Sequence, residues 1–313
     1  MNQKIATIFG GSGFIGRHLI RRLTKQDYRI IVATRSPHLN GFLKPLGDSG
    51  QVELVKTNLY DADNIKNVLQ NSNIAINLVG ILYETGKQKF HHLHSEFPKL
   101  LSKICTELNL EKLVHISALG VKENHTSRYM RSKLQGEQYI QNNFKSSVIL
   151  RPSLIFGPED KFFNSFATLA QFSPVIPLIG GGATLFEPIF VEDVADSIVQ
   201  SLKKTNLKPN IYEVGGDRYS FKELMKILLK EIKKKRFLIP IPFSVAKFQA
   251  FFLQMMPNPL LTVDQVKLLQ QNNIVSGKYP TLKDLGISGT TIQSILPKYI
   301  YRFRTGGQFE KNY

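Results

Sequence analysis

The sequence predicts an α/β fold: a doubly wound parallel sheet with a smaller, mainly helical C-terminal lobe. Three observations indicate it. Short apolar runs alternate with segments of helical period as far as residue 151, which is typical of repeated βαβ units. A glycine-rich turn directly follows the first apolar run. Beyond residue 151 the alternation loosens, and from residue 219 onward the pattern is mostly helical.

The apolar runs define the expected strands in chain order. We expect strands at residues 4–9, 29–33, 52–57, 74–79, 113–116, 148–151, 185–190 and 211–214. Amphipathic spacing predicts helices at 14–25, 129–141 and 244–256 and another that starts at 191. The Pro- and Gly-rich stretch from Ser173 to Gly182 is expected to be irregular.

These elements suggest two domains. Residues 1–218 are expected to form the sheet domain, with 156–184 as a loop-rich excursion towards the substrate side, and 219–313 the smaller lobe. The longest apolar stretch, 237–256, is interrupted by Pro240, Pro242 and Lys247, so no membrane-spanning helix is expected. The single cysteine, Cys105, is placed on the apolar side of a helix.

The formal net charge of +17 favours anionic partners, although a Lys- and Asn-rich composition without any such partner explains it equally well. Neither a helix-turn-helix nor an aromatic stacking pattern is found, so nucleic acid is disfavoured. The chain starts directly on the first apolar run, without a presequence. We therefore expect a cytoplasmic protein, with a peripheral position on the cytoplasmic face of a bacterial inner membrane left open.

The glycine-rich turn is Gly10-Gly11-Ser12-Gly13-Phe14-Ile15-Gly16. Its position between a predicted strand and a predicted helix favours binding of a dinucleotide, because backbone N–H groups at a helix start can face a pyrophosphate. The expected fold is therefore of the Rossmann type. The alternative is a tight turn without a ligand.

The end of the second strand favours NADP(H), with NAD(H) left open. An acidic residue about 20 positions beyond the glycines would bind the ribose hydroxyls of NAD, and Arg35 stands there instead. A guanidinium can hold a 2′-phosphate with two hydrogen bonds. The alternative is a solvated charge at a strand end.

A Tyr and a Lys four residues apart share a helix face, where the ammonium can assist proton transfer by the phenol. Three such pairs occur: Tyr83/Lys87, Tyr129/Lys133 and Tyr279/Lys283. Only Tyr129/Lys133 opens a helix soon after a strand and its loop, so this pair is the catalytic candidate. The group His91, His92 and His94 lacks further ligands at metal spacing, and no metal is expected.

Further motifs lie at residues 33–35, 77–80, 113–120, 129–133, 151–160 and 186–195. With the glycine loop they resemble an extended, atypical short-chain dehydrogenase/reductase, in the group that contains the NADPH-binding accessory subunit of respiratory complex I and its bacterial homologues. The resemblance runs through most of the chain. It implies a cofactor site formed by Gly10, Gly11, Ser12, Gly13, Phe14, Ile15, Gly16, Arg35, Asn58, Leu59, Leu78, Val79, Gly80, Ser117, Tyr129, Lys133 and Pro152.

Catalytic members of the wider superfamily add a hydroxyl and an Asn to the Tyr/Lys pair. Ser117 is the doubtful candidate for the hydroxyl, because Ala118 follows it, and the segment expected to supply the Asn carries histidines from His91 onward. Loss of one such donor lowers rates by about 10² to 10³. Enzymatic activity is therefore left uncertain.

Two functions follow from the resemblance. The first is an NADP(H)-binding protein of respiratory complex I or quinone metabolism, with a structural role and at most slow reductase activity. The second is an active NAD(P)-dependent nucleotide-sugar epimerase/dehydratase or quinone-pathway reductase. Expected partners are the nucleotide, respiratory-chain or quinone-pathway proteins and an anionic membrane surface, the last because a basic run at 230–236 precedes the apolar segment.

Overall fold

A computed structural model describes residues 3–204, 210–257 and 259–305 of the chain. They form two compact units. The first comprises Met1–Pro152, Val191–Val214 and Gly277–Ser288, and the second Ser153–Phe190, Gly215–Ser276 and Gly289–Tyr313. This division differs from the predicted boundary after residue 218, because the chain passes between the units several times. Residues 156–184 join the C-terminal segments instead of the sheet domain.

The first unit contains a parallel sheet in the strand order β11-β6-β5-β4-β1-β2-β3. Its strands are β1 (Ile5–Phe9), β2 (Arg29–Thr34), β3 (Val52–Lys56), β4 (Ile74–Asn77), β5 (Lys112–Ile116), β6 (Ser147–Pro152) and β11 (Ile211–Val214). Each begins and ends within two residues of a predicted strand. The predicted Rossmann-type sheet is confirmed.

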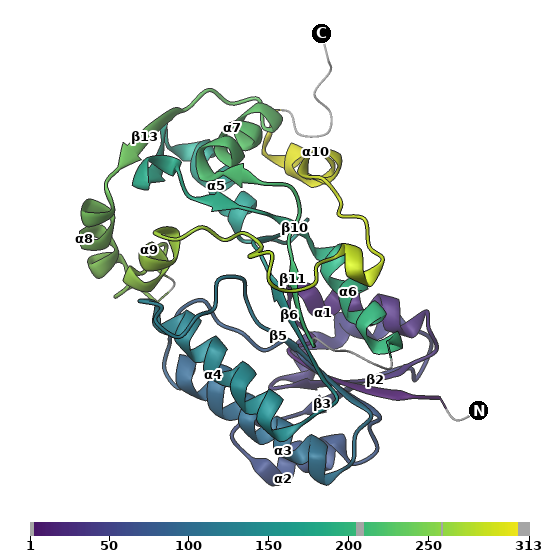
Figure 1. Ribbon diagram of the computed structural model, residues 1–313. Helices are drawn as coiled ribbons and strands as arrows, with labels where there is room; N and C mark the ends of the chain where they lie inside the picture. The colour runs from purple at the N-terminus through teal and green to yellow at the C-terminus, as the bar shows by residue number, and fades with distance from the viewer. Residues whose placement is uncertain (1–2, 205–209, 258, 306–313) are drawn as a thin grey trace. The chain divides into compact units, whose positions relative to one another are not determined.

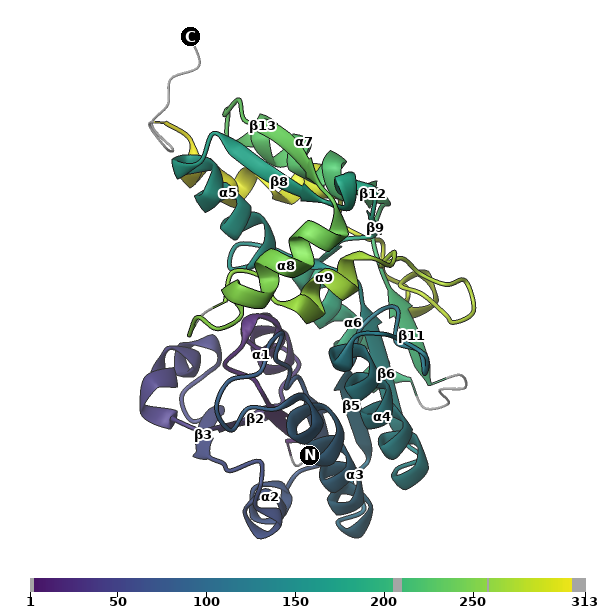
Figure 2. The same ribbon diagram turned by 90° about the vertical axis from the view of Figure 1, so that its left-hand side faces the viewer.

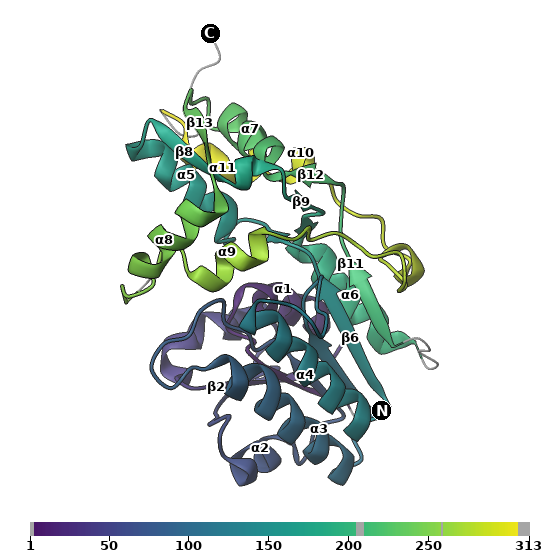
Figure 3. The same cartoon turned by 60° about the vertical axis from the view of Figure 1, so that its left-hand side comes forward.

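Helices cover both faces of this sheet. They are α1 (Phe14–Thr24), α2 (Ala62–Leu69), α3 (Phe97–Glu107), α4 (Arg128–Asn143) and α6 (Val191–Lys203), with short helical turns at η1 (Pro37–Leu46), η2 (His91–Glu96) and η4 (Lys283–Leu285). Figures 1 and 3 show α2, α3 and α4 on one face, whereas α1 packs with α6 on the other. Cys105 on α3 is fully buried, as expected.

The strand order reverses beside β1. From β1 the chain proceeds to β2 and β3 on one side, whereas β4, β5 and β6 follow on the other. Ligands of open α/β sheets bind at the carboxyl ends of the strands at such a reversal. The glycine-rich turn after β1 therefore occupies the position where a nucleotide is expected.

Helix α4 buries charged residues on its inner face. Met130, Lys133, Glu137 and Ile140 are all buried and recur every three or four residues. Glu137 receives two hydrogen bonds from the guanidinium of Arg151 on β6, at 2.9 and 2.6 Å. A buried carboxylate requires such a partner. The pair fixes α4 against the sheet next to Lys133.

The second unit comprises β7 (Ile155–Phe156), α5 (Phe162–Phe172), β8 (Val175–Ile179), η3 (Gly180–Gly182), β9 (Leu185–Phe186), β10 (Ile189–Phe190), β12 (Tyr219–Ser220), α7 (Phe221–Glu231), β13 (Phe237–Ile241), α8 (Phe243–Leu253), α9 (Val263–Leu269), α10 (Ile292–Ile295), α11 (Pro297–Ile300) and η5 (Tyr301–Phe303). Figure 2 shows β8 beside β13, with which it pairs in parallel. The stretch expected to be irregular thus contains β8, and the expected strand at 185–190 is divided into β9 and β10.

Helix α8 also differs from its prediction. It begins at Phe243 instead of Ser244 and ends at Leu253 instead of Met256. Its N-cap is Pro242, and no side chain accepts a capping hydrogen bond there. Ser244 already lies inside the first turn and does not cap the helix.

Gly136 allows α4 to approach η2 closely. A Cβ atom at this position would lie 2.0 Å from the carbonyl oxygen of His94. We expect Gly136→Ala to lower the free energy of unfolding by about 3 kcal/mol through overpacking, which exceeds the gain of about 1 kcal/mol that alanine has over glycine in a helix. Urea denaturation measures the change. The control Gln138→Ala, on the exposed side of α4, should stay within about 0.5 kcal/mol of the parent. Equal stability of the two variants would contradict the close contact.

Candidate functional site

The glycine loop brings backbone segments closer than side chains would allow. Gly10 has φ +79°, and a Cβ there would lie 3.0 to 3.1 Å from the backbone of Leu78 and Val79. The N–H of Gly13 donates to the carbonyl oxygen of Gly10 at 3.0 Å. A Cβ on Gly16 would lie 2.1 Å from the carbonyl oxygen of Gly11. The tight turn and its close approach to the segment after β4 therefore require glycine at these positions.

The loop leads directly into α1, whose N-cap is Gly13. No side chain forms a capping hydrogen bond there, and the first turn carries no acidic residue. The positive end of the helix dipole is therefore left for an external anion. Ser12, Phe14 and Ile15 complete the loop. A pyrophosphate fits this geometry.

The other predicted cofactor residues follow the carboxyl ends of four strands. Arg35 comes after β2, and its exposed guanidinium forms no ion pair with a described residue. Asn58 and Leu59 come after β3, the segment Leu78–Gly80 after β4, and Pro152 ends β6. Because the strands are parallel, all these positions share one edge of the sheet. The structure thus brings them to the edge that carries the glycine loop.

Lys133 lies at this edge of the sheet, where backbone carbonyl groups bind its ammonium. Its Nζ donates to the carbonyl oxygen of Ile116 at 3.0 Å and to that of Val79 at 3.4 Å. Burial lowers the pKa of the ammonium to about 8, although the charge of Glu137 acts in the opposite direction. The cation joins α4 to the ends of β4 and β5.

Tyr129 lies one turn before Lys133. Its ring meets Phe90 and His94 edge to face, with centroids 5.8 and 5.3 Å apart. Burial raises the pKa of its phenol to about 12. The phenol therefore stays protonated at neutral pH in the protein without nucleotide.

His94 lies on η2, in the segment where the resemblance implies a catalytic Asn. Its Nε2 accepts from the N–H of Ile81 at 3.1 Å, so Nδ1 carries the proton and donates to Ser132 Oγ at 3.1 Å. Burial, with Lys133 and His115 nearby, lowers the pKa of His94 to about 2. Both ring nitrogens are therefore used within the fold, and the ring stays neutral.

Three buried polar groups follow or end the central strands without a hydrogen-bond partner in the described structure. They are the amide nitrogen of Asn77, both ring nitrogens of His115 and Ser117 Oγ. Asn77 and His115 are direct register partners on β4 and β5. Burial and the charge of Lys133 hold the pKa of His115 well below its usual range. Sequence reasoning missed Asn77 and His115, although a lone histidine within an apolar strand marks such a position.

The described part of the chain contains no group of His, Cys, Asp or Glu side chains that could hold a metal ion. Nε2 of His91 lies 3.8 Å from Oε1 of Glu96, and both side chains are exposed. Nor does any helix of the described residues have the length and apolarity needed to cross a bilayer.

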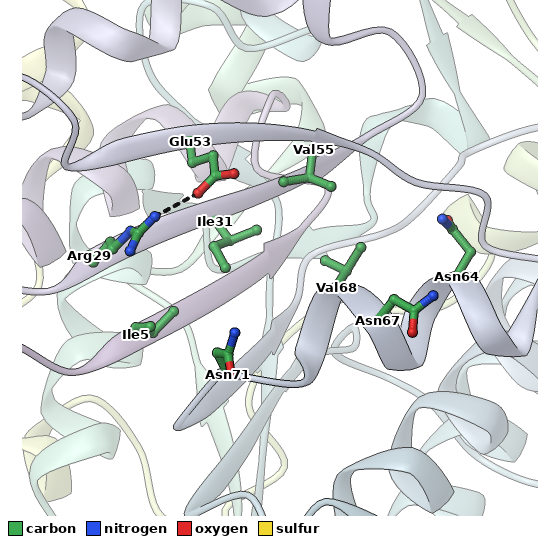
Figure 4. Close-up of a pocket in the computed structure, with 9 residues that line it drawn as sticks. All are labelled: Ile5, Arg29, Ile31, Glu53, Val55, Asn64, Asn67, Val68 and Asn71. Atoms are coloured by element: carbon green, nitrogen blue, oxygen red, sulfur yellow. Dashed lines mark hydrogen bonds and ion pairs between the residues drawn. The ribbon is translucent and has the colours of Figure 1, made fainter.

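Two surface cavities of about 420 Å³ each lie outside the predicted site. Figure 4 shows the first, between the sheet and α2: Arg29 and Glu53 pair across it, and three asparagines of α2 and its end, Asn64, Asn67 and Asn71, face it. Ile5 and Arg29 are the first residues of their strands. This cavity lies on the α2 side of the sheet, and no residue of the glycine loop lines it.

The NAD-dependent epimerase/dehydratase family description matches residues 6–215, about two thirds of the chain. The chain belongs to this family. It is 31% identical to the Arabidopsis thaliana mitochondrial NADH dehydrogenase (ubiquinone) 1 alpha subcomplex subunit 9, over 97% of this chain and 79% of that protein. The mouse protein of the same name is 30% identical, over 96% and 81%.

Solved structures share the fold at lower identity. The dTDP-glucose 4,6-dehydratase DesIV of Streptomyces venezuelae, solved with NAD and TYD bound, superimposes with a TM-score of 0.72 at 18% identity, over 96% of each chain. Likeness at this identity concerns the fold alone. The predicted family resemblance is confirmed by the family match and by the similarity to the plant and mouse subunits.

The pKa of Lys133 predicts how nucleotide binding depends on pH. Below pH 8 the ammonium is already formed and can bond a ribose hydroxyl. Above pH 8 binding must take up a proton, so affinity for NADPH should fall by up to about tenfold per pH unit. Calorimetric titration at several pH values measures this. In Lys133→Met the dependence should vanish, and an unchanged slope in that variant would assign it to another group.

Proposed function

We propose that the protein is an NADP(H)-binding accessory protein of respiratory complex I or of quinone metabolism, with a structural use of the nucleotide and at most slow reductase activity. The observation that carries this proposal is the state of His94. Both of its ring nitrogens are bonded to Ile81 and Ser132, where a catalytic relative would place an Asn. In this proposal Lys133 binds the nucleotide, whereas the nearby His94 uses both ring nitrogens in hydrogen bonds within the fold.

The residues at the carboxyl edge fit a bound nucleotide. The N–H groups at the start of α1 would face the pyrophosphate, with Gly10 and Gly16 allowing the tight turn before the helix, and Lys133 would bond the nicotinamide ribose. When bound, the nicotinamide supplies hydride transfer. Arg35 would hold the 2′-phosphate, which is the basis for placing NADP(H) before NAD(H). Tyr129 would lie beside the same ribose.

The proposed partners are respiratory-chain or quinone-pathway proteins. Their support is the similarity, over 97% and 96% of this chain, to the plant and mouse proteins named as NADH dehydrogenase subunits. We place the protein in the cytoplasm of a bacterium, at the cytoplasmic face of the inner membrane when it is assembled with such partners.

An active NAD(P)-dependent epimerase, dehydratase or quinone-pathway reductase is the second candidate. It is favoured by the presence of both Tyr129 and Lys133 on the first two turns of α4. Ser117 supplies a buried hydroxyl at the end of β5, although Ala118 follows it. In this role Tyr129 would be the acid/base and Lys133 its partner.

Cofactor choice is tested by titration with NADPH and NADH. We expect NADPH to bind more tightly, and Arg35→Ala to weaken NADPH alone by about 1 to 3 kcal/mol, the worth of a charge-assisted hydrogen bond. The control Arg21→Ala removes an exposed arginine near the opposite end of α1 and should leave both affinities unchanged. Equal binding of the two nucleotides by the parent protein would contradict the assignment.

The two candidate functions differ in turnover. The accessory role predicts that protein purified from native membranes retains NADP(H) and respiratory-chain subunits, and consumes no nucleotide with quinones or nucleotide sugars. Any slow reductase activity should disappear in Tyr129→Phe, because the phenol is the proton donor. Fast turnover that Tyr129→Phe abolishes would favour the enzyme instead. Activity that survives the substitution would exclude Tyr129 from either role.

A further inference from the structure

Helix α8 in the second unit buries small side chains and exposes large apolar ones, which is the reverse of an ordinary surface helix. Its buried residues are Ala246 and Ala250, which are 1% and 0% exposed. Phe248, Phe251 and Phe252 are 68%, 57% and 55% exposed. A surface helix normally turns its large apolar side chains towards the core. Here the small side chains face inward.

Ala246 and Ala250 belong to a small hydrophobic core of the second unit. Ala246 and Ala250 pack with Ile179 and Val266, and with partly buried neighbours from β13 and α9. Figures 2 and 3 show α8 and α9 side by side. The orientation of α8 is thus fixed by packing within its own unit, and this packing directs the phenylalanines outward.

The exposed rings form a continuous apolar face. Phe252 lies edge to face with both Phe248 and Phe251, at centroid distances of 5.1 and 5.4 Å. Met255 extends the same stripe and is exposed as well. Contiguous apolar surface of this kind marks an interaction site.

The chain around this face is strongly cationic. Residues 221–270 contain nine Lys and Arg against three acidic residues, and eight of the nine are lysines. Two of the three acids are engaged locally: Glu223 caps α7 through Ser220, and Glu231 pairs with Arg304. Lys247 precedes Phe248 directly, and Lys233 and Lys235 are exposed beside β13.

We propose that residues 243–256, which contain α8, and the basic segment 233–236 form a docking surface for an anionic lipid bilayer. Exposed phenylalanines on a helix that carries Lys247, in a lysine-rich stretch of the chain, suit a helix that lies at the headgroup boundary with its apolar face inserted. A protein interface is the poorer match, because lysine is depleted in such interfaces and arginine enriched. The lysine-rich surroundings therefore select lipid over protein.

This inference does not rest on nucleotide binding. The docking surface lies wholly in the second unit, and the glycine loop, Lys133 and Tyr129 lie in the first. If nucleotide binding fails its test, the lipid proposal is unaffected, and the reverse also holds, because the two kinds of binding are measured separately.

The absence of tryptophan from the chain makes a clean experiment available. Phe248→Trp places the chain's only tryptophan on α8, where it can be excited selectively, and Phe42→Trp places one at a comparably exposed position, 51%, on η1 of the first unit. The probe is vesicles of equal parts phosphatidylcholine and phosphatidylglycerol, with pure phosphatidylcholine as reference. We expect the emission of Phe248→Trp to shift to shorter wavelength on the anionic vesicles at low salt only, and that of Phe42→Trp to stay unchanged.

Vesicle flotation of the full chain supplies the second measurement. Phe248→Gln with Phe251→Gln, and separately Lys233→Glu with Lys235→Glu, should each lower the partition coefficient by about tenfold or more. The matched control, Leu39→Gln with Phe42→Gln, removes apolar side chains of similar exposure and should float like the parent. An unchanged circular dichroism spectrum and an unchanged thermal unfolding curve show that each variant is folded.

Three results would overturn the proposal. The parent protein could stay in solution with anionic vesicles at low salt, which would leave a protein partner for this face. Binding could persist in both double variants, which would place the lipid contact elsewhere. Phe248→Trp could shift without lipid as the protein doubles its mass in sedimentation, which would make the face a contact between two copies of this chain.

Discussion

A buried ammonium holds the nucleotide side of the first unit in place. Lys133 Nζ reaches from α4 to the carbonyl oxygens that end β5 and follow β4. Those carbonyls would otherwise be left in a poorly hydrated position, and the cation would be costly without them. Helix α4 can supply this group only because Gly136 lets it approach η2 and because Glu137 and Arg151 neutralise each other next to it. The position of Lys133 therefore depends on the close packing at Gly136 and on the Glu137–Arg151 ion pair. These features form one set.

The same set supports the proposal that the site binds a nucleotide with at most slow proton transfer. A lysine that already donates to two carbonyls is positioned for a ribose hydroxyl with its remaining proton. Tyr129, however, has a phenol whose pKa burial raises, and burial lowers the pKa of the neighbouring His94, which therefore stays neutral. General acid/base catalysis is most effective when the pKa of the group lies near the working pH. Before nucleotide binds, neither group meets that condition.

The sequence predicts most of the sheet because parallel strands buried on both faces appear as short apolar runs. It fails at β8 and β13, where Pro177 and Pro240 and a neighbouring glycine run resemble loop signals. Proline is tolerated there because β8 and β13 form a pair with two edges, and an edge strand has backbone groups that need no partner. Likewise, the boundary after residue 218 fails because pairing between distant segments, and not local composition, assigns 156–184 to the second unit.

For the site, candidates marked by local spacing can be proposed from the sequence, whereas roles that depend on contacts between distant segments cannot. The glycine loop carries its own spacing, and Tyr129 and Lys133 share a helix face. The role of His94 depends on Ile81 and Ser132, which lie 13 residues before it and 38 after it in the chain, so no local pattern reveals it. His115 is similar, because only the register of β5 against β4 places it beside Asn77.

The division into two units has a thermodynamic consequence for the two proposals. Nucleotide would bind residues of the first unit only, and lipid residues of the second. Independent sites leave each affinity unchanged when the other is filled, whereas any coupling must be reciprocal and equal in both directions. A protein that reports nucleotide state to a membrane complex needs such coupling. A protein that uses the nucleotide only as a structural element needs none, so the size of that coupling separates a sensor from a scaffold on the same fold.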